Sequence, residues 1–434
     1  MNPEFRRQLW LGFSVTRLAV LPLLLLACFT AAALSVTHDV PNIVAITGAV
    51  MFAVLVWGMG TLAAGSSVMD EITERTWDQQ RMSAMQPWAM TWGKLGGATA
   101  YGWYGGALCL LVAVPAAMLK EEIEKVLQLT ASAILLGVFL QSFLIAVNLQ
   151  LVKNGGLSTR RGGVWMLALV VLWGARPLFG MTRDVNVMWW GQPFDKFNFC
   201  MVSLALCAAC ALVAAWRSMA EVLAVRQLPW GWPALALVLT VYLSGFAPAH
   251  HAATLGVVGV CVCAALTYFA LLTEPQLRPM WQRVASRLAT EQWRAAWLQL
   301  PRWPTTLLLA VPFALAASFS LGMADVKHWP AIQMIKLYPA TFLLLMVRDC
   351  ALALFFAFAV NNQRALTAFL LSMFVLYAVL PWLVDTTNNG VLLGLVQPLA
   401  AQSSLSLVVA VIHAALALGL LGWRWRATAP THAH

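Results

Sequence analysis

Charged residues are scarce in this chain: Asp, Glu, Lys and Arg make up only 10% of its 434 residues, whereas 61% are hydrophobic. Soluble globular domains carry about a quarter charged residues, so this composition excludes a soluble protein. Apolar runs near or above the roughly 18 residues needed to cross a bilayer as a helix recur from end to end. The alternating pattern of an outer-membrane barrel is absent. We therefore expect an all-α polytopic membrane protein.

Motifs of the common nucleotide-binding and hydrolytic sites are also missing. There is no G-x-x-x-x-G-K-[ST] phosphate loop, because Gly93-Lys94 is followed by Leu95 and lacks the upstream glycine. H-E-x-x-H, G-x-S-x-G and a G-x-G-x-x-G within a βαβ unit are absent as well. Cys207 and Cys210 form a C-x-x-C, but no second pair follows at zinc-ligand spacing. The chain is therefore expected to hold no metal, and any nucleotide energy must come from another chain.

The apolar runs predict about twelve transmembrane helices in two parallel halves of six, residues 1–228 and 229–434. A short apolar piece at 390–399 leaves a range of eleven to thirteen. The predicted spans are 18–36, 43–66, 95–117, 127–150, 164–181, 198–216, 232–248, 252–273, 305–323, 337–360, 365–383 and 400–422.

Positive charge indicates the orientation of these spans. With the amino terminus inside, the cytoplasmic segments hold nineteen of the 27 Lys and Arg residues and the opposite segments hold six. Loops rich in Lys and Arg stay cytoplasmic, so both termini are predicted to be cytoplasmic. The net charge of +10 is explained by this topology, and no nucleic-acid partner is needed.

One polar segment, residues 71–88, interrupts the apolar pattern between the second and third predicted spans. Arg75 and Arg81 can pair with acidic neighbours one helical turn away, and Pro87 is expected to end the helix. The segment is predicted to form a short amphipathic helix at the cytoplasmic face. Its acidic stripe consists of Glu71, Glu74 and Asp78.

This segment resembles the coupling region of the type-2 exporter permeases of the ATP-binding-cassette (ABC) superfamily. Those proteins carry, between their second and third spans, an acidic residue, a Thr, a short amphipathic helix, a Pro and a Gly-Lys. The matching residues here are Glu71, Thr76, Pro87, Gly93 and Lys94. Arg75 stands where the family usually has a glycine. The resemblance covers residues 1–226, and residues 2–7 are similar to the family's interfacial elbow helix.

The resemblance implies the membrane permease subunit of an exporter in the bacterial inner membrane, with no catalytic role and no cofactor of its own. A separate ABC ATPase subunit, in two copies, would bind Mg-ATP and contact residues 71–88. The alternative is an ordinary solvated loop. The residues that the resemblance assigns to ATPase coupling are Glu71, Glu74, Arg75, Thr76, Asp78, Arg81, Pro87 and Lys94.

A second amphipathic segment, residues 278–298, follows the second span of the second half. Trp and Leu recur there at helical spacing with arginines between them, which is typical of a basic helix at a membrane interface. It is interpreted either as an anchor on membrane lipids or as a second coupling helix. If the segment is a second coupling helix, one chain supplies both coupling elements, like a fused pair of permeases. If it is a lipid anchor, two copies of the chain could assemble as a homodimer.

Small residues and one charge pair lie within the predicted spans. Gly93, Gly97, Gly102 and Gly106 form small-x-x-x-small pairs, which permit close helix packing within the chain or across a dimer. Arg348 and Asp349 form an intramembrane pair, which marks either a bridge between spans or a gating site.

Two rival functions remain open from sequence. A secondary transporter would use the intramembrane pair Arg348 and Asp349. A membrane-embedded lipid-modifying enzyme would use residues clustered at one face, such as the glutamates within 121–124 or the pair His250-His251. Spans lined by Leu, Ala and Val fit lipids, peptides, antibiotics or glycans equally well as substrates.

Overall fold

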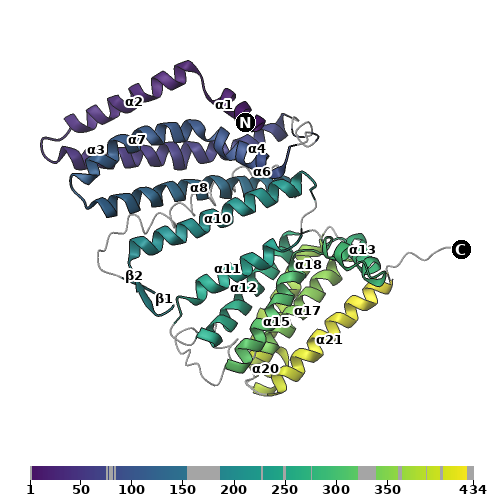
Figure 1. The fold of residues 1–434 in the computed structure, drawn as a ribbon. Coiled ribbons are helices and arrows are strands. Elements are labelled where there is room, and N and C mark those ends of the chain that lie inside the picture. The colour runs from purple at the N-terminus through teal and green to yellow at the C-terminus, as the bar shows by residue number, and fades with distance from the viewer. Residues whose placement is uncertain are drawn as a thin grey trace. The chain divides into compact units, whose positions relative to one another are not determined.

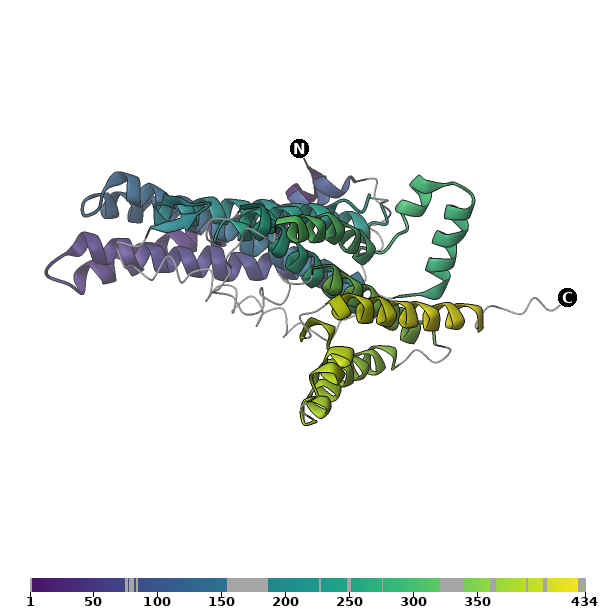
Figure 2. The ribbon, with the colours of Figure 1, turned by 90° about the horizontal axis from the view of Figure 1, so that it is seen from below.

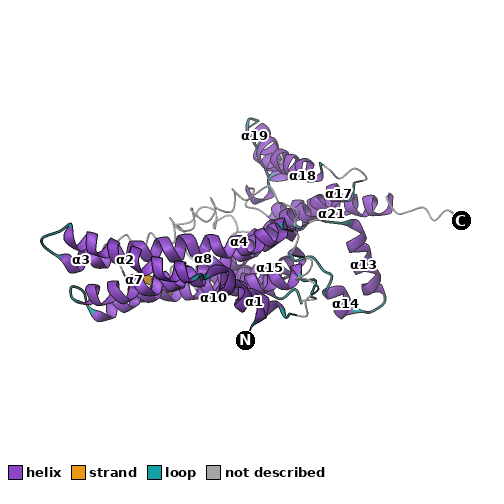
Figure 3. Ribbon diagram, turned by 90° about the horizontal axis from the view of Figure 1, so that it is seen from above, coloured by secondary structure: helices purple, strands orange, loops and turns teal. Residues whose placement is uncertain are grey.

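A computed structural model gives the fold of the chain (Figure 1). Its described secondary structure is helical apart from one two-stranded hairpin, β1 (Val187–Trp189) and β2 (Gln192–Phe194) (Figure 3). The structure describes all residues except 1, 75–76, 78–81, 83–84, 154–185, 226–227, 248–250, 275, 321–338, 360–363, 388, 401–403 and 428–434.

The chain forms two compact units. The first consists of Met1–Val187 with Pro193–Gln227, and the second of Met188–Gln192 with Leu228–His434. In the first unit α3, the π-helical stretch η1 and α4 follow one another without a break, as do α6 and η2. Its helices are α1 (Pro3–Gly12), α2 (Val15–Leu34), α3 (Val40–Phe52), η1 (Ala53–Gly60), α4 (Thr61–Thr73), α6 (Pro87–Trp92), η2 (Gly93–Ala98), α7 (Ala100–Met118), α8 (Ile123–Lys153) and α10 (Lys196–Val222).

Long apolar helices pack side by side in the first unit (Figures 1 and 2). Helix α8 packs against α10 and α4, and α3 packs against α7. Phe52, Val56 and Cys109 are buried in the core between α3, η1 and α7. The buried amide of Gln141 in α8 donates to the Val56 carbonyl of η1 at 3.1 Å and accepts from Trp103 Nε1 at 3.0 Å. The polar side chain therefore satisfies a carbonyl within the π-helical stretch, where the regular α-helical bonding is interrupted.

The second unit is built in the same way from apolar helices. Helix α12 packs against α15, and α17 packs against α21. Gly256 and Gly259 of α12 permit the close approach of α15, because a Cβ at Gly256 would lie 2.6 Å from the Ala317 nitrogen. The elements are α11 (Gly231–Ser244), α12 (His251–Thr273), α13 (Arg278–Ala289), α14 (Trp293–Trp297), α15 (Trp303–Ser320), α17 (Pro339–Ala357), α18 (Ala365–Phe374), η4 (Val375–Val379), α19 (Leu380–Asp385), α20 (Gly390–Val396), η5 (Pro398–Ala400) and α21 (Ser404–Ala427).

The predicted all-α membrane architecture is confirmed. Among the described residues, nine helices are long and apolar enough to cross a membrane, and each overlaps one predicted span. The predicted spans 232–248 and 305–323 correspond to two shorter apolar helices, Gly231–Ser244 and Trp303–Phe319. The predicted span 164–181 lies outside the described residues. The total of twelve and the arrangement in two parallel halves stay predictions.

Two local predictions differ from the structure. The segment 278–298 is two helices, α13 and α14, joined by a turn in which Glu291 has a φ of 57° (Figure 3). Few residues adopt a positive φ, and none continues an α-helix there, so the helix stops at Ala289. Pro87 begins α6 and does not end a helix. Proline has no N–H to donate and its φ suits the first helical turn, which explains this position.

Candidate functional site

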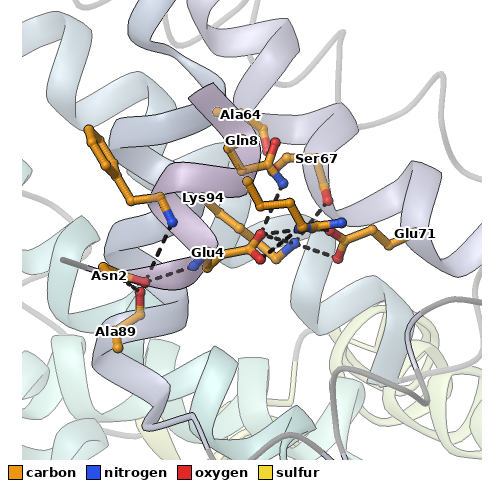
Figure 4. Close-up of polar contacts among 10 residues, drawn as sticks. Asn2, Glu4, Gln8, Ala64, Ser67, Glu71, Ala89 and Lys94 are labelled. Atoms are coloured by element: carbon orange, nitrogen blue, oxygen red, sulfur yellow. Dashed lines mark hydrogen bonds and ion pairs between the residues drawn. The ribbon is translucent and has the colours of Figure 1, made fainter. Parts of the chain in front are cut away.

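A buried lysine is the centre of a polar cluster in the first unit (Figure 4). The Lys94 side chain is fully buried, and its Nζ lies 3.4 Å from Glu4 Oε1. It donates to the Ser67 carbonyl at 3.2 Å and pairs with Glu71 Oε2. Both carboxylates are themselves buried. We call Glu4, Arg7, Glu71 and Lys94 the amino-terminal ion cluster.

Arg7 completes the cluster by bonding both carboxylates. Its Nε and Nη2 each donate to Glu4 at 2.9 Å, and Nη2 also bonds Glu71 Oε1. Gln8 Nε2 donates to Glu4 Oε1 at 2.9 Å. The cluster thus contains two cations and two anions. Buried charges are tolerated only when they are paired and hydrogen-bonded, and this arrangement meets both conditions.

The cluster shifts the protonation equilibria of α1, which lies outside the spanning helices. Burial raises the pKa of Glu4, but the hydrogen bond from Arg7, the Lys94 cation and the Gln8 amide together leave that pKa below its ordinary value. The hydrogen bond to Glu4 raises the pKa of Arg7 further, against the effect of burial, with Glu71 adding to the rise. Glu4 and Arg7 are therefore both ionised at neutral pH.

Local sequence explains why α1 lies at this place. The Asn2 side chain caps α1 by accepting from the Glu4 nitrogen at 3.0 Å, and Pro3 occupies the first helical position. The same Asn2 side chain donates to the Ala89 carbonyl of α6. Gly93 faces Glu4 across the helix contact, where a Cβ would lie 2.7 Å from Glu4 Cβ. Because Gly93 has no side chain, α1 can lie close to η2.

The cluster joins α1 to the two helical segments that flank the stretch 74–86. Glu71 lies in the last turn of α4, which precedes the stretch, and Lys94 lies in η2, shortly after it. Trp77, within the stretch, is 7% exposed, and Lys94 Nζ lies 5.7 Å from the centroid of its ring. Both ends of the stretch are therefore fixed to one buried charge centre and to α1.

The predicted coupling residues lie at four different places. Glu71 and Lys94 lie in the amino-terminal ion cluster, and Glu74 is exposed at the C-terminal end of α4. Pro87 lies at the start of α6. The residues outside the described part of the chain are Arg75, Thr76, Asp78 and Arg81.

Sequence reasoning did not identify Glu4 and Arg7 as partners of this segment. The available signal was an opposite-charge pair at i, i+3 on a short helix before the first span. Such pairs are usually solvated, and only the packing of α1 on η2 reveals that this one is shared with a lysine 90 positions away.

The four glycines predicted to serve helix packing all lie against other elements of the first unit. A Cβ at Gly97 would lie 2.6 Å from Gln8 Cβ, and one at Gly102 would lie 2.8 Å from the Leu55 carbonyl. Gly106 faces Val56. Gly93 and Gly97 thus accommodate α1, whereas Gly102 and Gly106 accommodate η1.

A second buried charge cluster lies within the second unit. Arg348 and Asp349 of α17 are 4% and 1% exposed, and Arg348 Nε donates to Asp349 Oδ1 at 2.9 Å. Tyr268 of α12 and Tyr377 of η4 donate to Asp349 Oδ2 at 2.8 and 2.7 Å. Arg348 lies over the Tyr377 ring at 4.9 Å and 3.5 Å from His413 Nδ1 of α21. We call these five residues the Asp349 cluster.

The Asp349 cluster has the properties of a bridge between helices. Both carboxylate oxygens of Asp349 accept hydrogen bonds, and the adjacent guanidinium balances its charge. Its residues come from four elements, α12, α17, η4 and α21.

No family model, curated protein or solved structure matches this chain. Within the described residues, no group of three or more His, Cys, Asp or Glu is placed to hold a metal ion. The likeness to exporter permeases therefore rests on the residues quoted above and stays a prediction.

Proposed function

We propose that this chain is the membrane permease subunit of an ABC exporter and that the stretch 74–86 is its contact with a separate ATPase. The observation that carries the proposal is the amino-terminal ion cluster, which fixes both ends of that stretch to buried charges. A segment held at both ends can pass a force from a docked protein to the helices that flank it. A loop free at its base would absorb the same force by bending.

The charges at the end of α4 support a docking role. Asp70, Glu71 and Glu74 lie at the C-terminal end of this helix, and its last turn holds no basic residue. Negative charge is unfavourable at a helix C-terminus, where the macrodipole is also negative. Lys94 offsets Glu71, but Asp70 and Glu74 are exposed. Two exposed acidic side chains at this position suit a basic surface on a partner.

In the proposed mechanism the partner ATPase, present in two copies with Mg-ATP, closes and moves the stretch 74–86. Because Glu71 and Lys94 are bonded to each other, α4 and η2 would move together, and α1 would follow through Glu4 and Arg7. The helices of the first unit would then rearrange to expose the substrate path to the opposite face. Both termini would lie on the cytoplasmic side of the bacterial inner membrane.

The experiment is charge reversal at the acidic stripe. The chain is tagged and purified from the membranes of its host in mild detergent, and bound protein and ATP hydrolysis are measured. We expect a nucleotide hydrolase to co-purify with the wild type and to be lost from Glu74→Lys/Asp78→Lys, while elution volume and helical content stay unchanged. Glu122→Lys is the matched control, because Glu122 is exposed beyond the other end of α7.

Two results would reject the proposal. One is purification with full transport activity and no companion hydrolase; the other is equal hydrolase recovery with the wild type and the charge-reversed variant. One copy of this chain per pair of ATPase subunits would indicate that the chain acts as a fused pair of coupling halves. Two copies would indicate a homodimer. Transport driven by a proton gradient alone would favour a secondary transporter instead.

A further inference from the structure

The helices α13 and α14, residues 278–297, form what we call the amphipathic hairpin. It connects the end of α12 at Thr273 to the start of α15 at Trp303, and these two helices pack against each other. The hairpin therefore leaves and re-enters the unit at the same end of the bundle. Arg278 Nη2 donates to the Trp425 carbonyl of α21 at 2.9 Å, so the end of a third apolar helix lies there as well. The hairpin thus lies at the level where spans meet a membrane surface.

One side of the amphipathic hairpin is fixed to the protein. Val284 is 3% exposed and Ala296 is 2% exposed. The Trp281 ring lies 5.6 Å from the Trp303 ring, and Arg287 Nη1 donates to the Ala295 carbonyl at 3.0 Å. The contact between Trp281 and Trp303 holds the start of α13 at the bundle, and α14 packs on α13 (Figure 3). The hairpin therefore presents a surface made by two helices that pack on each other.

The other side carries exposed aromatic and basic side chains. Trp293 and Trp297, one helical turn apart, are 67% and 42% exposed, and Leu288 is 40% exposed. Arg283 and Arg294 are exposed beside them, and neither guanidinium has a partner within the described part of the chain. Exposed indole rings are unfavourable in bulk water, and the arginines beside them are free to pair with anionic groups. They suit an interface with an apolar layer beneath anionic groups.

We propose that the amphipathic hairpin binds the anionic phospholipid surface of the bilayer that the spans cross. Residues 276–302 contain five arginines and one glutamate, so the surface is strongly positive. Anionic headgroups complement that charge, and the indole rings of Trp293 and Trp297 insert at headgroup depth. Because the hairpin projects from the ends of α12, α15 and α21, these headgroups lie within its reach without a second protein.

The experiment compares two lipid compositions with the full-length chain in nanodiscs. One nanodisc contains phosphatidylcholine alone and the other an equal mixture of phosphatidylcholine and phosphatidylglycerol. Amide hydrogen exchange over 278–297 is measured by mass spectrometry. We expect slower exchange in the mixed nanodisc, and a loss of that difference as salt is raised.

Arginine variants connect the exchange to the proposed contact. Each arginine held at an anionic surface contributes about a fivefold preference, so Arg283→Gln/Arg294→Gln should remove most of the effect of phosphatidylglycerol. Arg364→Gln is the matched control, because Arg364 is an exposed arginine outside the hairpin, and it should keep the effect. The variants must keep the wild-type elution volume and the same exchange over α12 and α15.

Equal exchange in the two lipids with the wild-type chain would overturn the proposal. So would a lipid effect that Arg283→Gln/Arg294→Gln leaves intact. Loss of a co-purifying ATPase from that variant, without any lipid effect in the wild type, would show that the hairpin docks a protein instead. The lipid measurement needs no ATPase, so its outcome is separate from that of the proposed exporter function.

Discussion

Replacing Lys94 with Met tests whether the amino-terminal ion cluster holds the first unit together. Methionine keeps the length of the side chain but removes its charge. At 3.4 Å and an effective dielectric constant of about 20, the attraction between Lys94 Nζ and Glu4 is about 5 kcal/mol. Part of this attraction offsets the desolvation of the buried groups. Arg7 remains in the variant, but its side chain is 41% exposed and must serve both carboxylates.

We expect Lys94→Met to lower the free energy of unfolding by about 3 kcal/mol, the lower end of the range for breaking a buried ion pair. The assay is a titration with dodecyl sulfate in mixed micelles, followed by helical circular dichroism. Lys125→Met is the control, since Lys125 pairs with Glu121 at a more exposed position. Its loss should be about 1 kcal/mol or less.

The double variant Lys94→Met/Glu71→Gln separates charge balance from packing. It removes one anion with the cation, so it should be more stable than the sum of the two single losses by about 1 kcal/mol or more. Without the lysine, Glu4 loses one of the cations that lower its pKa, so the deficit of Lys94→Met should shrink as pH falls. A deficit below about 1 kcal/mol, or strict additivity in the double variant, would refute the reasoning.

Three further outcomes follow from the same structure. Gly97→Ala should displace α1 and lower stability by about 1 to 3 kcal/mol, whereas Gly419→Ala, with open space around it, should be neutral or stabilising in the same assay. Asp349→Asn should remove about 3 kcal/mol or more by leaving a buried arginine unpaired, and Tyr377→Phe should remove only about 1.5 kcal/mol for one charged hydrogen bond; equal losses would contradict the central role of Asp349. Glu4 has a lowered pKa when folded, so its contribution is present above the unfolded pKa of 4.5 and is lost as pH falls through the folded pKa. Glu4→Gln should therefore unfold with a weaker dependence on acidic pH than the wild type.

The sequence predicted the spans well because each depends on a local property. A run of about twenty apolar residues crosses a bilayer as a helix whatever lies beside it. The described helices overlap eleven of the predicted spans for this reason. The predictions of one helix over 278–298 and of a helix end at Pro87 were wrong, because a helix boundary depends on the backbone conformation of single residues. Hydrophobic periodicity is a property of a whole segment and does not show the backbone conformation of one residue.

The candidate site was predictable only in part. Lys94 and Glu71 were identified as members of one motif through the resemblance to exporter permeases. Their bond to each other was not predicted, because residues 71 and 94 lie in different helices. The partners of Asp349 were likewise hidden: Tyr268 and Tyr377 lie far from it in sequence, in α12 and η4. Tyrosines in apolar spans carry no signal of a shared carboxylate.

The composition of the two buried clusters also limits what each can do. Glu71 and Lys94 lie in the two helical segments that flank the stretch 74–86, so under the proposed function a force on that stretch would reach this cluster. Asp349 lies near the middle of α17, and its partners are side chains from α12, α17 and η4. Removal of Asp349 would leave a buried arginine unpaired in an apolar environment, which is unfavourable. The first cluster is therefore the better candidate for a moving coupling element, and the second for a fixed point about which the helices of its unit move.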